Sequence, residues 1–372
     1  MTGVGSTATQ RLAGIESLRA YAALSIVLFH LVWIGQAQPP EALNAIKWHG
    51  AYGVQLFFVV SAFSLSYGYW GRLATERELQ GYFVRRFARI APLYYAIFAL
   101  QLVHLALTTG IHFSLADILL CLTFAFNFVP HLVSGIVPAS WTIGVEMVFY
   151  LFFPFFLLLC RRWWAALLLL ALTLLLAWRF SADFAGVRGM EMFAAYSIVA
   201  QLPFFCCGML AFHAFGALSA RPFVQAHRRG ISWTLVGIAL AGVAFMASRW
   251  SGYPFFEGRG LRPVWHSFWG LPFAVLCVGM AIHPTRFVSN ALTRYLGKVS
   301  YSLYLVHPNV VLLLMRAGLF SWIYAAFEGN ALLAFLASAL VTIAIVAALS
   351  AFFFRFVEAP GMAWGKRRAA SA

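Results

Sequence analysis

Two residues near the start of the chain, Arg19 and His30, could do chemistry together. They are eleven positions apart, or about three turns of an α-helix, so both side chains leave one face, roughly 16 Å apart along the axis. His30 lies well inside an apolar run that begins just after Arg19. Ionisable groups within a bilayer are costly and usually mark a cavity, a pathway or a reaction centre. We therefore expect this helix to carry a functional site.

A basic loop at 71–89 supplies a second candidate. Its Arg86 and Arg89 are three positions apart, so they share a face if the segment is helical. Paired guanidinium groups suit phosphate oxygens, which predicts a clamp for a nucleotide-bearing cofactor, beside Arg19. The alternative is that these arginines only hold the loop on the cytoplasmic side.

A carboxylate that we expect at a similar depth to the histidine is the third candidate, Glu146. Of the 11 acidic residues, it alone is expected inside a long apolar run. We place Glu146 roughly 8 Å below the outer surface, and His30 about 16 Å from the inner edge of a roughly 30 Å core. At similar depths the two could pair, adjust each other's pKa and act as acid and base. The alternative is a structural glutamate that holds helices together by hydrogen bonds.

Weaker candidates lie in three other apolar segments. Ser61 should lie near mid-membrane and either lines a cavity or allows close helix packing. Trp141 is expected at the outer interface. Tyr301, Tyr304 and His307 are three apart and share one side of a helix, so they either line a cavity with polar tips or pack as aromatics at the membrane edge.

The elements that position these residues are membrane helices. The chain has 372 residues, 63% hydrophobic and only 10% charged, far from the roughly 25% charged residues of soluble domains. We predict an all-α polytopic membrane protein, a single domain over 1–372. The ten predicted spans are 20–36, 52–70, 90–109, 141–159, 163–179, 194–213, 231–250, 264–282, 299–319 and 331–354. The apolar segment 116–129 is too short to cross, so we expect it to be re-entrant or interfacial.

The distribution of basic residues predicts the orientation. With both termini inside and 116–129 not crossing, 19 of the 26 Lys and Arg residues, Arg11 among them, face the cytoplasm and six face out. If 116–129 crossed, the counts would be 12 and 13, which breaks the positive-inside rule. The same rule accounts for most of the net charge of +15, so we expect no nucleic-acid partner.

Processing, disulfide and metal signals are weak. The first apolar run resembles a signal peptide, but it contains His30 and we expect it to remain as the first span. The five cysteines lie in or beside apolar runs without a Cys-x-x-Cys pair, which indicates reduced, buried residues. No metal-ligand spacing occurs among the ten histidines, so we expect no metal.

Five sequence blocks carry a resemblance to a known family. In chain order they are ESLRAYAALSIVLFH, GVQLFFVVSAFSL, RRFARIAPLYY, SWTIGVEMVFYLFFP and LGKVSYSLYLVHP. Together they resemble the acyltransferase 3 family of integral membrane acyltransferases. The chain departs from the family's usual pattern at Ala20, Gln55 and Ala62, so Gln55 is not assigned to the site.

The resemblance implies an inner-membrane O-acyltransferase, most simply an O-acetyltransferase. It implies that cytosolic acetyl-CoA or another acyl-CoA donates the acyl group. The implied acceptor is a hydroxyl of a cell-envelope or exported polysaccharide, or of its lipid-linked precursor. His30 resembles the catalytic histidine and Arg19 its motif partner, while Arg86 and Arg89 resemble the basic pair and Glu146 the acidic residue. The implied partners are the lipid bilayer, the acyl-CoA, the carbohydrate acceptor and polysaccharide assembly proteins. No hydrolase-like periplasmic domain is expected, so a second acyl-handling step would need a separate protein.

Two other classes of function stay open at the sequence level. A proton-coupled exporter of a glycan or small metabolite would use His30 and Glu146 as a relay, but it predicts inverted halves and leaves the arginine pair unexplained. A non-catalytic scaffold in a polysaccharide assembly complex predicts that replacing His30 is harmless.

Overall fold

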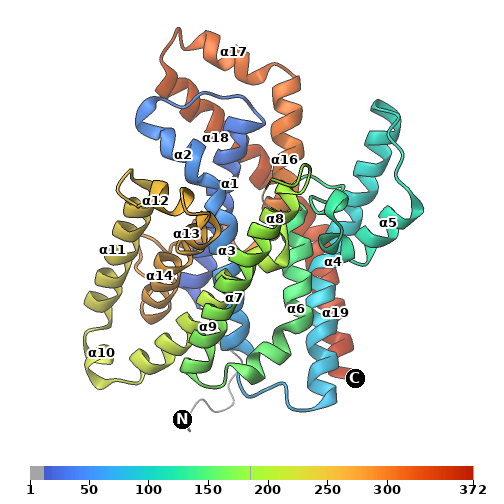
Figure 1. The fold of residues 1–372 in the computed structure, drawn as a ribbon. Helices are drawn as coiled ribbons and strands as arrows, with labels where there is room; N and C mark the ends of the chain where they lie inside the picture. Colours follow the sequence, from blue (N-terminus) through green and yellow to red (C-terminus); the bar gives the residue numbers. More distant parts are fainter. Residues whose placement is uncertain (1–11, 185, 372) are drawn as a thin grey trace.

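The computed structural model describes residues 12–184 and 186–371, and the regular structure in these ranges is helical (Figure 1). Nine helical stretches there are long and apolar enough to cross a membrane, and one bent pair makes up to ten. The predicted all-α, polytopic fold is confirmed. The spanning elements are α1 (Ala13–Trp33), α3 (Gly53–Tyr69) after the short α2 (Asn44–His49), α4 (Glu76–Thr108), α6 (Trp141–Leu159), α7 (Trp163–Phe184), α9 (Ile198–Ser219) after α8 (Glu191–Tyr196), α11 (Arg228–Ala247), α14 (Gly270–Ile282) after α13 (Arg262–Ser267), α16 (Ser300–Arg316), and α18 (Ala331–Phe353), which continues through a π-helix (Phe354–Glu358) into α19 (Ala359–Ser371).

Shorter helices join the spans. They are α5 (Leu115–Leu122), α10 (Pro222–Ala226), α12 (Tyr253–Glu257), α15 (Ala291–Lys298) and α17 (Leu319–Ala326). The segment 116–129 forms the eight-residue α5 and a 3-10 turn, too short to cross a bilayer, as predicted. The bent pair lies elsewhere, where α17 turns away from α16 by 63°.

Helix α4 corrects the predicted basic loop at 71–89. The helix begins at Glu76 and runs for 33 residues, so the arginines stand on its first turns. The Thr75 side chain accepts a hydrogen bond from the Glu78 amide, and the Glu78 carboxylate accepts one from the Thr75 amide at 3.0 Å. This capping box satisfies donors that a helix start leaves free. Pro92 lies inside this helix.

Helix α1 lies against α3, α14, α15 and α16. Two glycines allow the closest approaches. A Cβ at Gly14 would lie 2.2 Å from the Met280 carbonyl oxygen, and one at Gly297 would lie 1.8 Å from the Glu16 carbonyl oxygen. Only glycine fits at such distances, and it lets α14 and α15 pack on the first turns of α1, next to Arg19.

The ends of the described chain meet at one side of the bundle. Figure 1 shows α19 beside the first half of α4, at the end opposite α17. Leu12 before α1 and Lys366 of α19 line one cavity at this side. Arg11, counted above among the cytoplasmic charges, lies outside the described residues. The five cysteines are buried and free, as predicted.

Candidate active site

A cavity of about 590 Å³, the first cavity, opens between α1, α3, α4, α6 and α16. Helix α3 runs along it, so Phe57 near the helix start and Arg72 beyond its end mark opposite ends of the cavity. Five arginines stand in its wall: Arg19, Arg72, Arg85, Arg86 and Arg89. The other end is apolar and aromatic, with Val54, Phe57, Phe58 and Tyr304. The cavity can therefore accept a molecule that is anionic at one end and uncharged at the other.

Three arginines of the first cavity are held by neutral groups. Arg19 Nη2 donates to Ser64 Oγ at 3.1 Å. Arg86 Nη2 and Arg85 Nε both donate to the Tyr69 hydroxyl at 3.2 Å. The ion pairs found among residues 12–184 and 186–371 do not involve these arginines. Arg86 also keeps a buried Nε without a hydrogen-bond partner. Such guanidinium groups keep donors available for an anionic ligand.

Glu146 faces the same cavity from α6. Its Oε1 accepts hydrogen bonds from Ser61 Oγ at 2.7 Å and from the Tyr150 hydroxyl. The predicted pairing of Glu146 with His30 is wrong in this structure, since both donors belong to other residues. The two side chains do not meet because α6 turns Glu146 toward α3.

His30 pairs with a second histidine instead. Its Nδ1 lies 2.7 Å from Nε2 of His307 on α16, with the ring centroids 4.9 Å apart. His307 is completely buried, while His30 is half-buried. A neutral histidine pair of this kind has one ring donating and the other accepting.

Tyr304 connects the first cavity with the histidine pair. It lines the cavity, and its ring centroid lies 5.6 Å from that of His307. Its hydroxyl accepts from Thr142 Oγ1 and donates to the Ala139 carbonyl, both at 2.9 Å. Neither His30 nor His307 lines the first cavity, so Tyr304 stands between the cavity and the pair.

The remaining predicted residues have separate places. Tyr301 lines the first cavity, but its hydroxyl is tied to the Ile90 carbonyl at 2.7 Å. Trp141 stacks on Tyr196 with centroids 4.3 Å apart and does not line the first cavity. In the described ranges no group of three or more His, Cys, Asp or Glu side chains could hold a metal ion.

Comparison with known proteins decides the family. The acyltransferase domain family matches residues 12–351, nearly the whole described chain. The chain belongs to the acyltransferase 3 family. A protein of Acidianus two-tailed virus named "Putative acetyltransferase ORF330" is 32% identical over 149 residues, which cover 38% of this chain and 39% of that protein. The match thus spans about two fifths of that relative. No solved structure gives a significant match. The chain is a multi-pass membrane protein of this acyltransferase family, so the resemblance is confirmed.

Sequence reasoning missed three site residues of this acyltransferase. Tyr150 stands one turn after Glu146, and that spacing could have indicated their hydrogen bond. Tyr69 orders two arginines from the end of α3. Glu358 is only 1% exposed, so a second carboxylate lies inside the bundle besides the half-buried Glu146. The apolar segment that contains Glu358 is followed closely by basic residues. This pattern is typical of a residue at the membrane interface.

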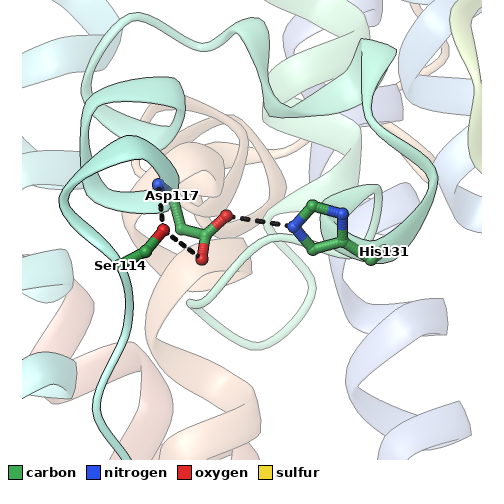
Figure 2. Close-up of polar contacts among 3 residues, drawn as sticks. All are labelled: Ser114, Asp117 and His131. Atoms are coloured by element: carbon green, nitrogen blue, oxygen red, sulfur yellow. Dashed lines mark hydrogen bonds and ion pairs between the residues drawn. The ribbon is translucent and has the colours of Figure 1, made fainter.

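A serine, an aspartate and a histidine also meet outside the acyltransferase cavity (Figure 2). Asp117 accepts from Ser114 Oγ at 2.7 Å and contacts His131 Nε2 at 3.0 Å. Ser114 also caps α5 by accepting from the Asp117 amide at 3.1 Å. The hydrogen bonds from His131 and Ser114 lower the pKa of Asp117. Figure 2 shows the aspartate between the other two, so this cluster fastens α5 to the following turn and does not activate a serine.

Proposed function

We propose that this acyltransferase moves an acetyl group from cytosolic acetyl-CoA to a hydroxyl of a cell-envelope or exported polysaccharide, or of its lipid-linked precursor. One observation carries the proposal. An arginine-lined cavity ends at Tyr304, which contacts His307, which in turn binds His30. Acetyl-CoA fits this cavity, because its anionic phosphates match the arginine-lined end and its uncharged thioester matches the apolar end.

The donor enters from the side that the charge count assigns to the cytoplasm. Arg19, Arg86 and Arg89 bind its phosphates, since guanidinium groups form strong, directional hydrogen bonds to phosphate oxygens. The pantetheine arm then lies along α3 toward the apolar end. Phe57 and Tyr304, in edge-to-face contact with centroids 6.0 Å apart, close this end and must separate for the thioester to reach His30.

The histidine pair sets which nitrogen of His30 reacts. The backbone carbonyls of Leu303 and Tyr304 act on the His307 ring from its own helix, although the buried Nδ1 of His307 makes no hydrogen bond. If His307 Nδ1 carries the proton, that proton interacts favourably with the two carbonyl oxygens. If Nδ1 carried a lone pair instead, the lone pair would be buried next to these oxygens, which is unfavourable. His307 Nε2 is then the acceptor, and His30 Nδ1 must be the donor. The Nε2 atom of His30 is left with its lone pair and can act as a base.

The transfer step follows from this tautomer. Nε2 of His30 takes the proton of the acceptor hydroxyl while that oxygen attacks the thioester carbon. The new ester C–O bond forms, the C–S bond breaks, and the proton passes to the departing sulfur to give free CoA. The same Nε2 would carry the acyl group if transfer passed through a covalent intermediate.

We assign Glu146 a different role from the one its depth suggested. It fixes Ser61 and Tyr150 in the cavity wall, and its charge acts on Arg19. It therefore balances part of the arginine charge when no donor is bound, instead of orienting His30.

Mass spectrometry of envelope glycans tests the proposal. Cells that lack this protein should lose an acetyl ester on a glycan, and the wild-type gene should restore it. His30→Ala should not restore it, while His112→Ala, an exposed histidine away from the cavity, should. Identical glycans with and without the protein would contradict the polysaccharide acceptor.

A further inference from the structure

A second cavity, of about 390 Å³, adjoins the first at the arginine cluster. Both cavities are lined by Arg19, Ser64, Gly68, Arg86 and Arg89, so these residues form the partition between them. Each volume lies within the roughly 300–1,000 Å³ of small-molecule sites. The two chambers can hold two parts of one molecule that crosses the partition.

The second cavity also uses elements that the first does not. Lys298 at the end of α15, Lys366 of α19 and Glu358 at the end of the π-helix line it. The Lys298 ammonium lies 5.1 Å from the centre of the Phe354 ring, another lining residue. Five cationic side chains face two carboxylates, Glu16 and Glu358, across this space. The excess of positive charge selects an anionic ligand.

Glu358 shows that the ligand also offers hydrogen-bond donors. Its Oε2 accepts from Ser302 Oγ at 2.7 Å, while its Oε1 is buried without a hydrogen-bond partner. A buried carboxylate oxygen left unpaired is costly. A nucleotide supplies phosphates for the lysines together with hydroxyl and amino donors for such an oxygen. Inorganic phosphate lacks the ribose hydroxyl and the adenine amino group.

We propose that the second cavity binds the adenosine 3′,5′-bisphosphate part of the acyl-CoA donor. This assignment rests on the proposed function and adds the nucleotide subsite to it. The 3′-phosphate contacts Lys298 and Lys366, and Glu358 Oε1 accepts a hydrogen bond from the ribose or adenine. The diphosphate then lies at the partition, on Arg19, Arg86 and Arg89, and the pantetheine arm continues into the first cavity.

Binding measurements on the full chain in lipid nanodiscs test the subsite. The probes are acetyl-CoA, adenosine 3′,5′-bisphosphate and acetyl-pantetheine, which lacks the nucleotide. Lys298→Gln/Lys366→Gln should weaken binding of the first two by about tenfold or more, the loss expected when charged hydrogen bonds are removed. Binding of acetyl-pantetheine should not change. Arg294→Gln/Arg367→Gln is the matched control, because these exposed residues share the same two helices but line neither cavity.

The possible outcomes distinguish a failure of the nucleotide subsite from a failure of the proposed function. If the wild type binds acetyl-CoA and the lysine variant binds it equally well, the subsite is wrong and the donor assignment stands. If the lysine substitutions weaken the binding of acetyl-pantetheine as much as that of acetyl-CoA, the cavity does not recognise the nucleotide and the proposal also fails. If the wild type binds none of the three probes, the acyl-CoA donor itself is wrong.

Discussion

His30 Nδ1 and His307 Nε2 lie 2.7 Å apart, although 277 positions separate the two residues in the chain. The contact joins the first and a late helix of the bundle, α1 and α16. In many catalytic sites a carboxylate beside the catalytic histidine orients the imidazole ring and selects its tautomer. Here His307 occupies the corresponding position beside His30. His307 is thus a positioning residue in the proposed mechanism.

Replacing His307 tests that role. His307→Leu removes the acceptor for His30 Nδ1 and should lower the turnover rate by about 10²–10⁴-fold, the usual contribution of a positioned acid or base. The KM for acetyl-CoA should hardly change, because His307 does not line the donor cavity. His307→Gln, whose amide oxygen can accept the same hydrogen bond, should recover part of the rate. Equal rates for the Leu and Gln variants would contradict an orienting hydrogen bond.

The arginines should control donor affinity. Arg86→Ala removes a buried guanidinium that a phosphate would contact, and a hydrogen bond to a charged group contributes about 1.5–3 kcal/mol. The Kd for acetyl-CoA, measured by calorimetry, should therefore rise at least about tenfold. Arg161→Ala, an exposed arginine outside the first cavity, serves as the control. Unchanged affinity in the Arg86 variant would remove the phosphate clamp.

The close packing of α15 on α1 predicts a stability effect. A Cβ at Gly297 would lie 1.8 Å from the Glu16 carbonyl oxygen, so Gly297→Ala must push the helices apart. Overpacking costs about 1–3 kcal/mol, and the melting temperature should fall. Gly237→Ala, in the middle of α11 where a Cβ meets nothing within 4 Å, should leave the melting temperature unchanged or raise it. The reverse order would contradict this packing.

The Asp117 cluster predicts a pH dependence of α5. Hydrogen bonds from His131 and Ser114 lower the pKa of Asp117 in the folded protein, below its ordinary value of 3.8. The stabilisation is therefore present above that ordinary value and is lost as the pH falls through the lowered pKa. Amide exchange of 114–132 should be slow near neutral pH and faster, relative to intrinsic rates, in Asp117→Asn at the same pH. Equal protection in both proteins would show that the cluster does not hold this segment.

The sequence predicted the spans and part of the cavity wall, because both follow local patterns. Long apolar runs define helices that cross a bilayer, and residues three apart share a helix face, so Arg86 and Arg89 fell together on α4. The start of α4 was missed because its capping box, Thr75 with Glu78, lies in a polar segment that resembles a loop.

Contacts between distant helices could not be predicted in the same way. Depth along a helix follows from residue counting, but the direction in which a side chain points depends on how the helix is rotated against its neighbours. Glu146 turns toward Ser61 on α3, while His30 turns toward His307 on α16. Glu358 was not predicted because it is the last residue of the π-helix, whose extra residue per turn changes the face from which its side chain leaves.

The most direct test follows the acetyl group itself. Membrane vesicles that contain the protein are supplied with acetyl-CoA carrying a labelled acetyl group, and the label is measured in extracted glycan and in the protein. The account predicts label in the glycan with the wild-type protein and with His112→Ala, and a loss of at least about 10²-fold with His30→Gln. Equal labelling of the glycan by the wild type and by His30→Gln would contradict the central claim that His30 catalyses acyl transfer.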